Sequence, residues 1–300
     1  MRVKKGILLA GGNATRLFPL TLSTSKHLLP IWNKPMIYYP LSNFLKAGIN
    51  KILLISSKKY ISFYKQLLGN GRLYGINITY KIQNKPLGIP QAFSIGKEFI
   101  NNDPIALNLG DHIFFGNDID KKIKSNIKNF NKTTIFTYKH QDFSKYGVIE
   151  YSKNKKPLKI YEKPNISTSK EIVCGFYIFD KKVDNYIKNL KKSKRGEYEI
   201  SDLINLYINN RTIKIEKIDY KSNYWIDAGT PEKIYEASQI IKKIEKNKKK
   251  SIGSIEIAAF NSGLISYSKL KHLCSLYNNK PYGNYLNNFT KKLKNNKYEK

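Results

Sequence analysis

The sequence predicts an α/β fold whose centre is a Rossmann-like, mixed but mostly parallel sheet with helices on both faces. Short apolar runs alternate with helical patterns through the first 139 residues, which is typical of parallel strands joined by helices. These runs are nearly continuous in apolar residues, as expected of strands buried on both faces. Consecutive strand patterns in the second half predict a small β-rich insertion, and the last fifty residues predict a C-terminal helical extension.

The first half is expected to alternate strands and helices. In the segment 35–48, Ile37, Leu41 and Phe44 fall on one helical face. Gly48 then closes the helix as a C-cap. Strands are predicted at 5–10, 51–57, 77–83, 104–111 and 133–139, with helices at 35–48 and near 59–68, 90–100 and 118–130.

The second half is expected to contain more consecutive strands. A helix is predicted to begin at Thr230, whose hydroxyl suits an N-cap, with Pro231 at the first helical position. The last fifty residues are expected to be mostly helical and polar. Strands are predicted at 147–152, 158–163, 172–180, 212–219 and 223–227, with helices near 181–191 and 199–210.

Composition narrows the class of protein. The chain has 300 residues and 41% hydrophobic content, enough for a sizeable core. No run of about 18 apolar residues occurs, so neither a membrane-spanning helix nor a membrane partner is expected. The two cysteines, Cys174 and Cys274, favour a reducing, cytoplasmic location without a disulfide framework. The four histidines show no metal-ligand spacing.

The net charge of +32 is a possible signal of nucleic-acid binding. Only five of the 54 basic residues are arginine, the residue that nucleic-acid surfaces favour. The lysines are spread along the chain with many Asn, Ile and Tyr residues, as expected of a genome rich in A and T. We therefore expect no specific nucleic-acid partner. The alternative, a nucleic-acid binder, would show steeply salt-dependent retention of DNA or RNA.

A glycine turn follows the first predicted strand in "KGILLAGGNATRLFPLT" (5–21). Gly11 and Gly12 permit a tight turn and the close approach of another group. Arg16 follows the turn, and Lys26 lies ten residues later in "SKHLLP". Together the two cations can clamp a polyphosphate from two sides. The alternative is that both are ordinary surface cations.

Two aspartates follow predicted strands in distant parts of the chain: Asp111 in "NLGDHIFFG" and Asp227 in "YWIDAGTPE". Ligands of open α/β sheets bind at the carboxyl ends of strands, so the two carboxylates can share one Mg²⁺ on bound phosphates. Either aspartate alone would more often belong to a turn or a helix cap. Two further motifs, "YGVIE" and "YEKP", offer residues for a sugar pocket.

Taken jointly, these motifs make the chain resemble the sugar-1-phosphate nucleotidylyltransferases. The matching stretches appear in family order between residues 6 and 286: "GILLAGG.ATRL", "SKHLLPI..KPMIYYPLS", "QAF.IG..FI", "LGDHIFFG", "YGVIE", "EKP", "RGEYEISD", "W.DAGT" and "YGNYL". The combination of "KPMIYYPL" with "SKHLLP" points to the thymidylyl branch.

The resemblance implies Mg²⁺-dependent transfer of a thymidylyl group from dTTP to glucose-1-phosphate. The products would be dTDP-glucose and pyrophosphate, the first step toward dTDP-rhamnose and related deoxysugars. By the family pattern, Arg16 and Lys26 would steady the triphosphate and the departing pyrophosphate, and Lys163 would neutralise the sugar phosphate. Asp111 and Asp227 would hold Mg²⁺.

The resemblance also assigns the remaining binding positions and the domain plan. It implies a nucleotidyltransferase domain over 1–250, with a nucleotide-binding part at about 1–130 and a sugar-binding part at about 131–230. Residues 251–300 would form the extension, which helps assemble a homotetramer in the family. The sugar would be bound by Tyr146, Gly147, Glu162 and Val173, and the nucleotide by Leu9, Gly11, Gly12, Thr15, Gln83 and Gly88.

Several residues depart from the family pattern. Ala14 replaces the last glycine of the turn, so an active enzyme should show negative φ at this position or a shifted loop. His27 stands where this branch has glutamine, and Leu87 where an aspartate is common. Phe260 and Asn117 replace an arginine and a histidine linked to feedback by the end-product nucleotide sugar, which implies weakened inhibition by dTDP-rhamnose.

The departures leave two alternatives open: a non-catalytic or feedback-insensitive sugar-nucleotide-binding homologue, and a uridylyltransferase. A decayed catalyst would be expected to lose charged site residues. All five remain, which favours the enzyme; they are Arg16, Lys26, Asp111, Lys163 and Asp227.

Overall fold

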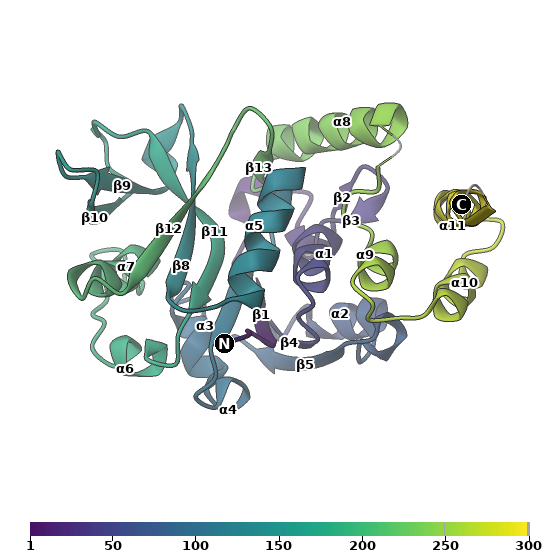
Figure 1. Ribbon diagram of the computed structural model, residues 1–300. Helices are drawn as coiled ribbons and strands as arrows, with labels where there is room; N and C mark the ends of the chain where they lie inside the picture. Colours follow the sequence, from purple (N-terminus) through teal and green to yellow (C-terminus); the bar gives the residue numbers. More distant parts are fainter. Residues whose placement is uncertain (249, 299–300) are drawn as a thin grey trace.

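The computed structural model describes residues 1–248 and 250–298 and centres on a nine-stranded mixed sheet (Figure 1). The predicted α/β class is confirmed. The main strand order is β10-β9-β11-β6-β1-β4-β5, and β8 pairs with both β11 and β12. The strands are β1 (Lys5–Ala10), β4 (Lys51–Ser56), β5 (Asn77–Ile82), β6 (Ile105–Leu109), β8 (Thr133–Lys139), β9 (Gly147–Tyr151), β10 (Pro157–Glu162), β11 (Glu171–Phe179) and β12 (Ile213–Ile218).

Helices cover both faces of this sheet, as the continuous apolar strands predict. In β1, Ile7 and Leu8 are fully buried and point to opposite layers of the core. One layer holds α1 (Tyr38–Lys46), α2 (Ile61–Leu68) and α5 (Asn117–Lys128); the other holds α3 (Gln91–Ile95), α4 (Lys97–Ile100), α6 (Val183–Ile187) and α7 (Ile200–Asn209). Four short 3₁₀ turns are η1 (Thr15–Leu17), η2 (Lys26–Leu28), η3 (Arg72–Tyr74) and η4 (Phe143–Lys145).

The parallel pairing is concentrated in the first half of the chain. β1 pairs in parallel with β4 and β6, and β4 pairs in parallel with β5. β11 then runs antiparallel to β6, β8 and β9, so the β-rich second half extends the same sheet. The proposed boundary near residue 130 stays a prediction, because no break in the sheet marks it.

Two small antiparallel pairs were not predicted. β7 (His112–Phe115) pairs with β13 (Tyr224–Asp227). The predicted strand 104–111 is β6, which ends at Leu109, and β7 follows it after a turn at residues 110–111. β2 (Pro30–Ile31) pairs with β3 (Lys34–Pro35), so the helix predicted from residue 35 begins at Tyr38. Both strand pairs are short and depend on partners that a local pattern does not reveal.

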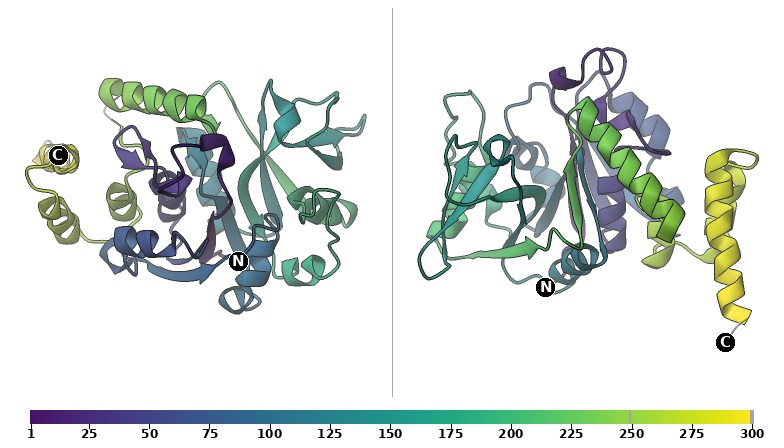
Figure 2. Two further views of the ribbon diagram at one scale, coloured as in Figure 1. Left: turned by 180° about the vertical axis from the view of Figure 1, so that it is seen from behind. Right: turned by 90° about the horizontal axis from the view of Figure 1, so that it is seen from above.

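The C-terminal part is helical, as predicted, but the expectation of a polar surface is wrong for α9. Its residues Ile255, Ile257 and Ala259 are buried, and the helix packs against α1. α10 and α11 lie outside it, away from the sheet (Figure 2). Of the helices described, none is long and apolar enough to cross a membrane. The helices of this C-terminal part are α8 (Pro231–Lys248), α9 (Ile255–Asn261), α10 (Tyr267–Leu276) and α11 (Pro281–Tyr298).

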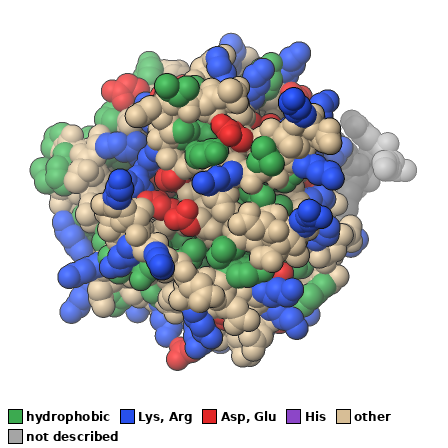
Figure 3. Space-filling model, turned by 90° about the vertical axis from the view of Figure 1, so that its left-hand side faces the viewer, with side chains coloured by type: hydrophobic (Ala, Val, Ile, Leu, Met, Phe, Trp, Pro, Cys, Tyr) green, Lys and Arg blue, Asp and Glu red, His purple; other side chains and the backbone are tan. Residues whose placement is uncertain are grey.

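Basic side chains are dispersed over the surface that includes β9, β10 and α7. In Figure 3, lysine and arginine atoms alternate with uncharged and apolar atoms over this face and do not gather in a stripe. Nucleic-acid binding typically uses a basic patch clustered on one face. The distribution on this face therefore fits the expectation that the charge is spread along the chain.

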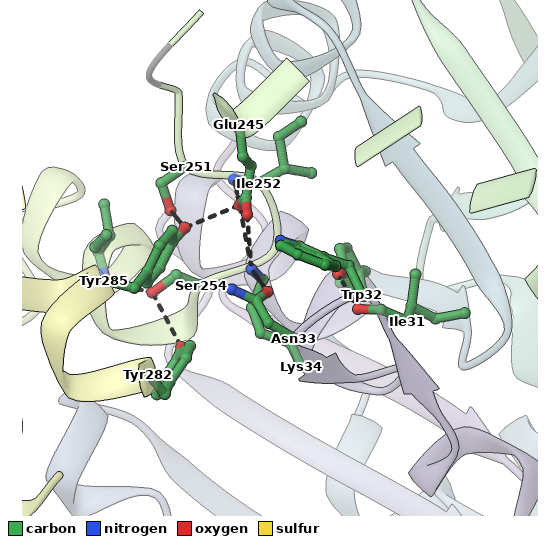
Figure 4. A network of polar contacts seen from close by, with 12 residues as sticks. Ile31, Trp32, Asn33, Lys34, Glu245, Ser251, Ile252, Ser254, Tyr282 and Tyr285 are labelled. Atoms are coloured by element: carbon green, nitrogen blue, oxygen red, sulfur yellow. Dashed lines mark hydrogen bonds and ion pairs between the residues drawn. The ribbon is translucent and has the colours of Figure 1, made fainter. Parts of the chain in front are cut away.

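A buried ion pair joins the β2–β3 hairpin to the C-terminal helices (Figure 4). The side chain of Lys34 is 0% exposed, and its ammonium lies 3.1 Å from Oε1 of Glu245 on α8. The Tyr285 hydroxyl of α11 donates to the same carboxylate at 2.9 Å, and the Tyr285 ring lies 4.6 Å from the ammonium. Buried charges need such partners, so this network holds hairpin and extension together.

A second buried carboxylate, Glu256 of α9, lacks a full set of partners. Its Oε2 accepts hydrogen bonds from Tyr282 at 2.7 Å and Ser254 at 2.9 Å. Its Oε1 is buried and has no partner in the described residues. Burial raises the pKa of Glu256, although the bonds from Tyr282 and Ser254 oppose this. A carboxyl with a raised folded-state pKa lowers stability as pH rises above the ordinary value of 4.5.

We expect Glu256→Gln to stabilise the protein at pH 8 by about 1 kcal/mol, or roughly 2 °C in Tm. The amide removes the buried charge and keeps an oxygen for Tyr282. The gain should shrink near pH 4.5, where the carboxyl is protonated in the folded state. Urea denaturation at both pH values measures this difference.

The matched control is Glu245→Gln, which should destabilise the protein by about 3 kcal/mol because it removes the charge partner of the buried Lys34. Equal losses of stability for the two variants at pH 8 would contradict the interpretation of Glu256.

Candidate active site

All fifteen candidate residues line one cavity of about 780 Å³. It lies where β1, β5 and β6 end and β11 begins, the edge at which ligands bind in open α/β sheets. The residues that the structure brings together are Leu9, Gly11, Gly12, Thr15, Arg16, Lys26, Gln83, Gly88, Asp111, Tyr146, Gly147, Glu162, Lys163, Val173 and Asp227.

Lys26 and Asp111 form an ion pair at the wall of the cavity. Lys26 lies on η2 and Asp111 in the turn between β6 and β7, and both side chains are largely buried. Burial would raise the pKa of Asp111, but the charge and hydrogen bond of Lys26, together with neighbouring groups, hold this pKa well below its usual range. Asp111 is therefore a permanent anion, paired with a cation that faces the cavity.

Asp227 reaches the same place through the pairing of β7 and β13. The register sets Asp227 opposite His112, and the N–H of Ala228 donates to the carbonyl of Asp111 at 3.0 Å. Oδ1 of Asp227 is buried and finds no hydrogen-bond partner in the described part of the chain. A buried carboxylate oxygen without a partner is suited to a bound cation.

Arg16 approaches this carboxylate from the glycine turn. A Cβ built on Gly229 would lie 2.6 Å from Nη2 of Arg16 and 2.9 Å from Oδ1 of Asp227, so both groups crowd the same backbone. Burial raises the pKa of Tyr146, and the nearby Asp227 raises it further. Tyr146 therefore stays a neutral hydroxyl at the border between the carboxylates and the sugar-side residues.

The side of the cavity predicted to bind the nucleotide depends on the contact between Gly11 and Gln83. A Cβ on Gly11 would lie 2.1 Å from Oε1 of Gln83, so any larger residue would displace this amide. Nε2 of Gln83 donates to Gln91 at 2.8 Å, which fixes the orientation of the amide. Leu87, the departure from aspartate, contributes its backbone: its N–H donates to Gln91 and its carbonyl accepts from Tyr198.

The side of the cavity predicted to bind the sugar centres on Glu162. Ser201 donates to its Oε2 at 3.0 Å, and Nη2 of Arg195 lies 4.0 Å from its Oε1. Burial raises the pKa of Glu162, and the bond from Ser201 opposes this. The backbone N–H of Lys163 donates to the carbonyl of Tyr146 at 3.0 Å, which joins the two sugar-side motifs.

His27, the departure from glutamine, is a buried neutral imidazole. Its side chain is packed beside Gly110, and its Nδ1 lies 3.2 Å from the Ser25 hydroxyl and 3.3 Å from that of Tyr64. Burial lowers the pKa of His27 to about 3, with the Lys26 charge adding to the effect. His27 therefore adds no positive charge beside Lys26 at neutral pH.

The family of this chain follows from its similarity to known proteins. Residues 5–244 match the profile of the family described as nucleotidyl transferase. The chain belongs to the nucleotidyl transferase family. It is 39% identical over 288 residues to a glucose-1-phosphate thymidylyltransferase of Neisseria meningitidis, covering 96% of this chain and all of that one. A protein of the same name from Mycolicibacterium smegmatis is 38% identical, over 94% and 97% of the two chains.

This nucleotidyl transferase shares its fold with solved structures of similar proteins. A Bacillus anthracis structure assigned as a glucose-1-phosphate thymidylyltransferase has a TM-score of 0.72 and 36% identity, covering 79% of this chain and 94% of that one. A UDP-glucose pyrophosphorylase complexed with UDP-glucose has a TM-score of 0.71. At 23% identity, this second likeness concerns the fold alone.

Sequence reasoning assigned no role to several other residues of this nucleotidyl transferase cavity. The motif "RGEYEISD" was a usable signal, because six of its residues line the cavity wall. The polar and charged members of the missed set are His112, Ser144, Lys145, Tyr177, Arg195, Glu197, Tyr198, Glu199 and Ser201.

The two residues linked to feedback lie in different surroundings. Asn117 lines a second cavity of about 360 Å³ and accepts a hydrogen bond from Lys250 at 2.9 Å. Phe260 packs against Tyr267 and Phe289, and does not belong to the described residues that line this cavity. The proposed weakening of feedback stays a prediction.

Of the two outcomes expected at Ala14, negative φ does not occur, and a shifted loop stays a prediction. Ala14 has φ 50° and ψ 34°, in the left-handed region. Its carbonyl accepts hydrogen bonds from the Thr21 hydroxyl at 3.0 Å and from the N–H of Leu17 at 3.1 Å. These contacts hold the loop in a conformation that glycine adopts without the penalty of a Cβ.

We expect Ala14→Gly to stabilise the protein by up to about 1 kcal/mol, because it relieves left-handed strain. The matched control is Ala47→Gly, where φ is −79°; this change should destabilise by about 1 kcal/mol. Urea unfolding of both variants measures the difference. Destabilisation of the same size at both positions would show that Ala14 is unstrained.

Proposed function

We propose that this nucleotidyl transferase transfers a thymidylyl group from dTTP to glucose-1-phosphate, with dTDP-glucose and pyrophosphate as products. The observation that carries the proposal is the convergence of all fifteen candidate residues on one cavity. The phosphate-binding cations lie between a nucleotide side with Gln83 and a sugar side with Glu162. The names of the most similar relatives support the same substrate pair.

The reaction needs charge neutralisation and alignment more than a proton acceptor. An oxygen of the sugar phosphate forms a bond to the α-phosphorus of dTTP, and the bond from that phosphorus to the bridging oxygen breaks to release pyrophosphate. The attacking phosphate is already anionic near pH 7, so no general base is required. Lys163 would neutralise this phosphate, while Arg16 and Lys26 would steady the triphosphate and its leaving group.

Asp111 and Asp227 fit a divalent metal such as Mg²⁺. The low pKa of Asp111 keeps it ionised, and Oδ1 of Asp227 is buried without a partner among the described residues. Bound Mg²⁺ would neutralise phosphate charge and align the reacting groups. Lys26 compensates the charge of Asp111, so the carboxylate stays in place at the cavity wall.

The role in a route toward dTDP-rhamnose, the cytoplasmic location and the homotetramer stay predictions from the resemblance. The same holds for weakened feedback inhibition, which a dTDP-rhamnose inhibition curve would test. A curve as steep and sensitive as in typical relatives would contradict it.

We expect dTTP with glucose-1-phosphate to give the highest rate of pyrophosphate release in a panel of nucleoside triphosphates and sugar-1-phosphates with Mg²⁺. Removal of the metal by EDTA should abolish this rate. Asp111→Asn and Asp227→Asn should each lower kcat at least about 100-fold, because each removes a carboxylate from the phosphate site.

The control for these two variants is Asp103→Asn. Asp103 is half exposed and forms an ion pair with Lys5. It precedes β6, at the end of this strand that is opposite to the cavity. Its rate should match that of the wild type. No turnover with any substrate pair would sink the proposal, and a higher rate with UTP would favour the uridylyl alternative.

We expect Gly11→Ala to raise the KM for dTTP about tenfold or more, with little change in the KM for glucose-1-phosphate. The added Cβ displaces the Gln83 amide that would contact the pyrimidine edge. Gln83→Ala should have the same effect, and the double variant should add nothing further. Additive effects in steady-state kinetics would show that Gly11 acts independently of Gln83.

A further inference from the structure

Three buried side chains beside Lys26 have no role in the mechanism above. Ser25 and His27 flank Lys26 in the chain, and Tyr64 belongs to α2; all three are buried. The Ser25 hydroxyl lies 2.7 Å from that of Tyr64, and Nδ1 of His27 lies 3.2 Å from Ser25 Oγ and 3.3 Å from the Tyr64 hydroxyl. The three polar atoms form a closed triangle, and we call these residues the Tyr64 triad.

The Tyr64 triad joins the loop that presents Lys26 to a helix behind the cavity wall. Lys26 and His27 line the cavity, whereas Ser25 and Tyr64 do not belong to the described residues that line it. The residue on each side of Lys26 contacts the same Tyr64 hydroxyl. The backbone is therefore held on both sides of Lys26, whichever atom of each contact carries the hydrogen.

The chain leading to Lys26 makes two further contacts with the residues that directly precede α2. The Tyr60 hydroxyl donates to the carbonyl of Thr21 at 3.2 Å, and the Lys59 ammonium donates to the carbonyl of Leu22 at 3.0 Å. The loop from residue 21 to residue 27 therefore rests on α2 and on the turn before it.

The opposite edge of the His27 ring lies against the turn that carries Asp111. A Cβ built on Gly110 would lie 2.6 Å from Cδ2 and 3.0 Å from Nε2 of His27. The ring thus fills the space between Tyr64 and this turn. Since Lys26 is paired with Asp111, the same ring packs beside both members of the ion pair.

We propose that the Tyr64 triad positions the Lys26 ammonium for the triphosphate and the departing pyrophosphate. This role rests on the proposed function, since it concerns one of the cations that would hold those phosphates. A lysine ammonium is a point charge on a flexible stem, so its location depends on how the stem and its backbone are held. A misplacement of about 1 Å can cost roughly 100-fold in rate. Ser25 and Tyr64 are positioning residues, because they act through Lys26.

We expect Tyr64→Phe, which removes only a hydroxyl from the buried ring, to lower kcat for pyrophosphate release roughly tenfold. The KM for glucose-1-phosphate should stay within about twofold of the wild-type value, because Lys26 would contact the phosphates of dTTP and not the sugar phosphate. Ser25→Ala removes a second corner of the triangle through a smaller change and should shift kcat in the same direction.

The Lys26→Ala background separates positioning from a general loss of structure. If the Tyr64 triad acts through Lys26, Tyr64→Phe should cause no further loss of kcat/KM once residue 26 is alanine. A loss of the same factor in both backgrounds would overturn the proposal.

The matched control is Tyr80→Phe. The Tyr80 hydroxyl donates to the carbonyl of Gly69 at the end of α2, at 2.6 Å, and Tyr80 does not belong to the described residues that line the cavity. This variant also removes one hydroxyl bound at α2, but at the end of the helix away from Lys26. Its kinetic constants should match those of the wild type.

Calorimetric binding of inorganic pyrophosphate with Mg²⁺ keeps the positioning role separate from the proposed function. Tyr64→Phe should weaken this binding about fivefold or more, and Tyr80→Phe should leave it unchanged. Weaker binding to Tyr64→Phe would support the role of the Tyr64 triad even if the wild type turned over no substrate pair, an outcome that would overturn only the proposed function. Equal affinity of the wild type and Tyr64→Phe for pyrophosphate would overturn the role of the triad.

Discussion

The pairing of β7 with β13 is the contact on which the rest of the site depends. β7 follows directly after β6. It lies at the edge of the sheet where β1 ends and the glycine turn begins. The antiparallel register brings Asp227 opposite His112 and Trp225 opposite Phe114. A strand from the second half of the chain is thereby fixed beside the Lys26–Asp111 pair, and backbone hydrogen bonds determine its position.

Opposite charges hold two cations of the cavity in place. Lys26 is paired with Asp111, and Arg195 forms two hydrogen bonds to Glu199, at 3.1 and 2.9 Å. Groups that are already oriented need little rearrangement when charge develops on a phosphate. This local organisation differs from the net charge of +32, which is spread along the whole chain.

The C-terminal helices contact the β2–β3 hairpin, which follows η2 in the chain. Lys26 lies on η2, and the β2–β3 hairpin carries the buried Lys34. Glu245 of α8 and Tyr285 of α11 surround that ammonium. The loop that presents Lys26 is therefore continuous with a segment that the extension holds. The extension therefore contacts, through Tyr285, a segment that directly follows the loop that presents Lys26.

The sequence by itself determined the α/β class, most strand positions and the residues of the cavity. Each of these follows from a local pattern: apolar runs mark buried strands, and Gly11, Lys26 and Asp111 lie in loops that follow or join them. The motifs shared with a known family supplied the roles of these residues. Tertiary structure alone decided the left-handed backbone of Ala14 and the burial of α9 with Glu256. Each depends on partners distant in the chain or on loop geometry. A local sequence pattern does not predict which donor or carbonyl from elsewhere in the chain will lie beside a residue.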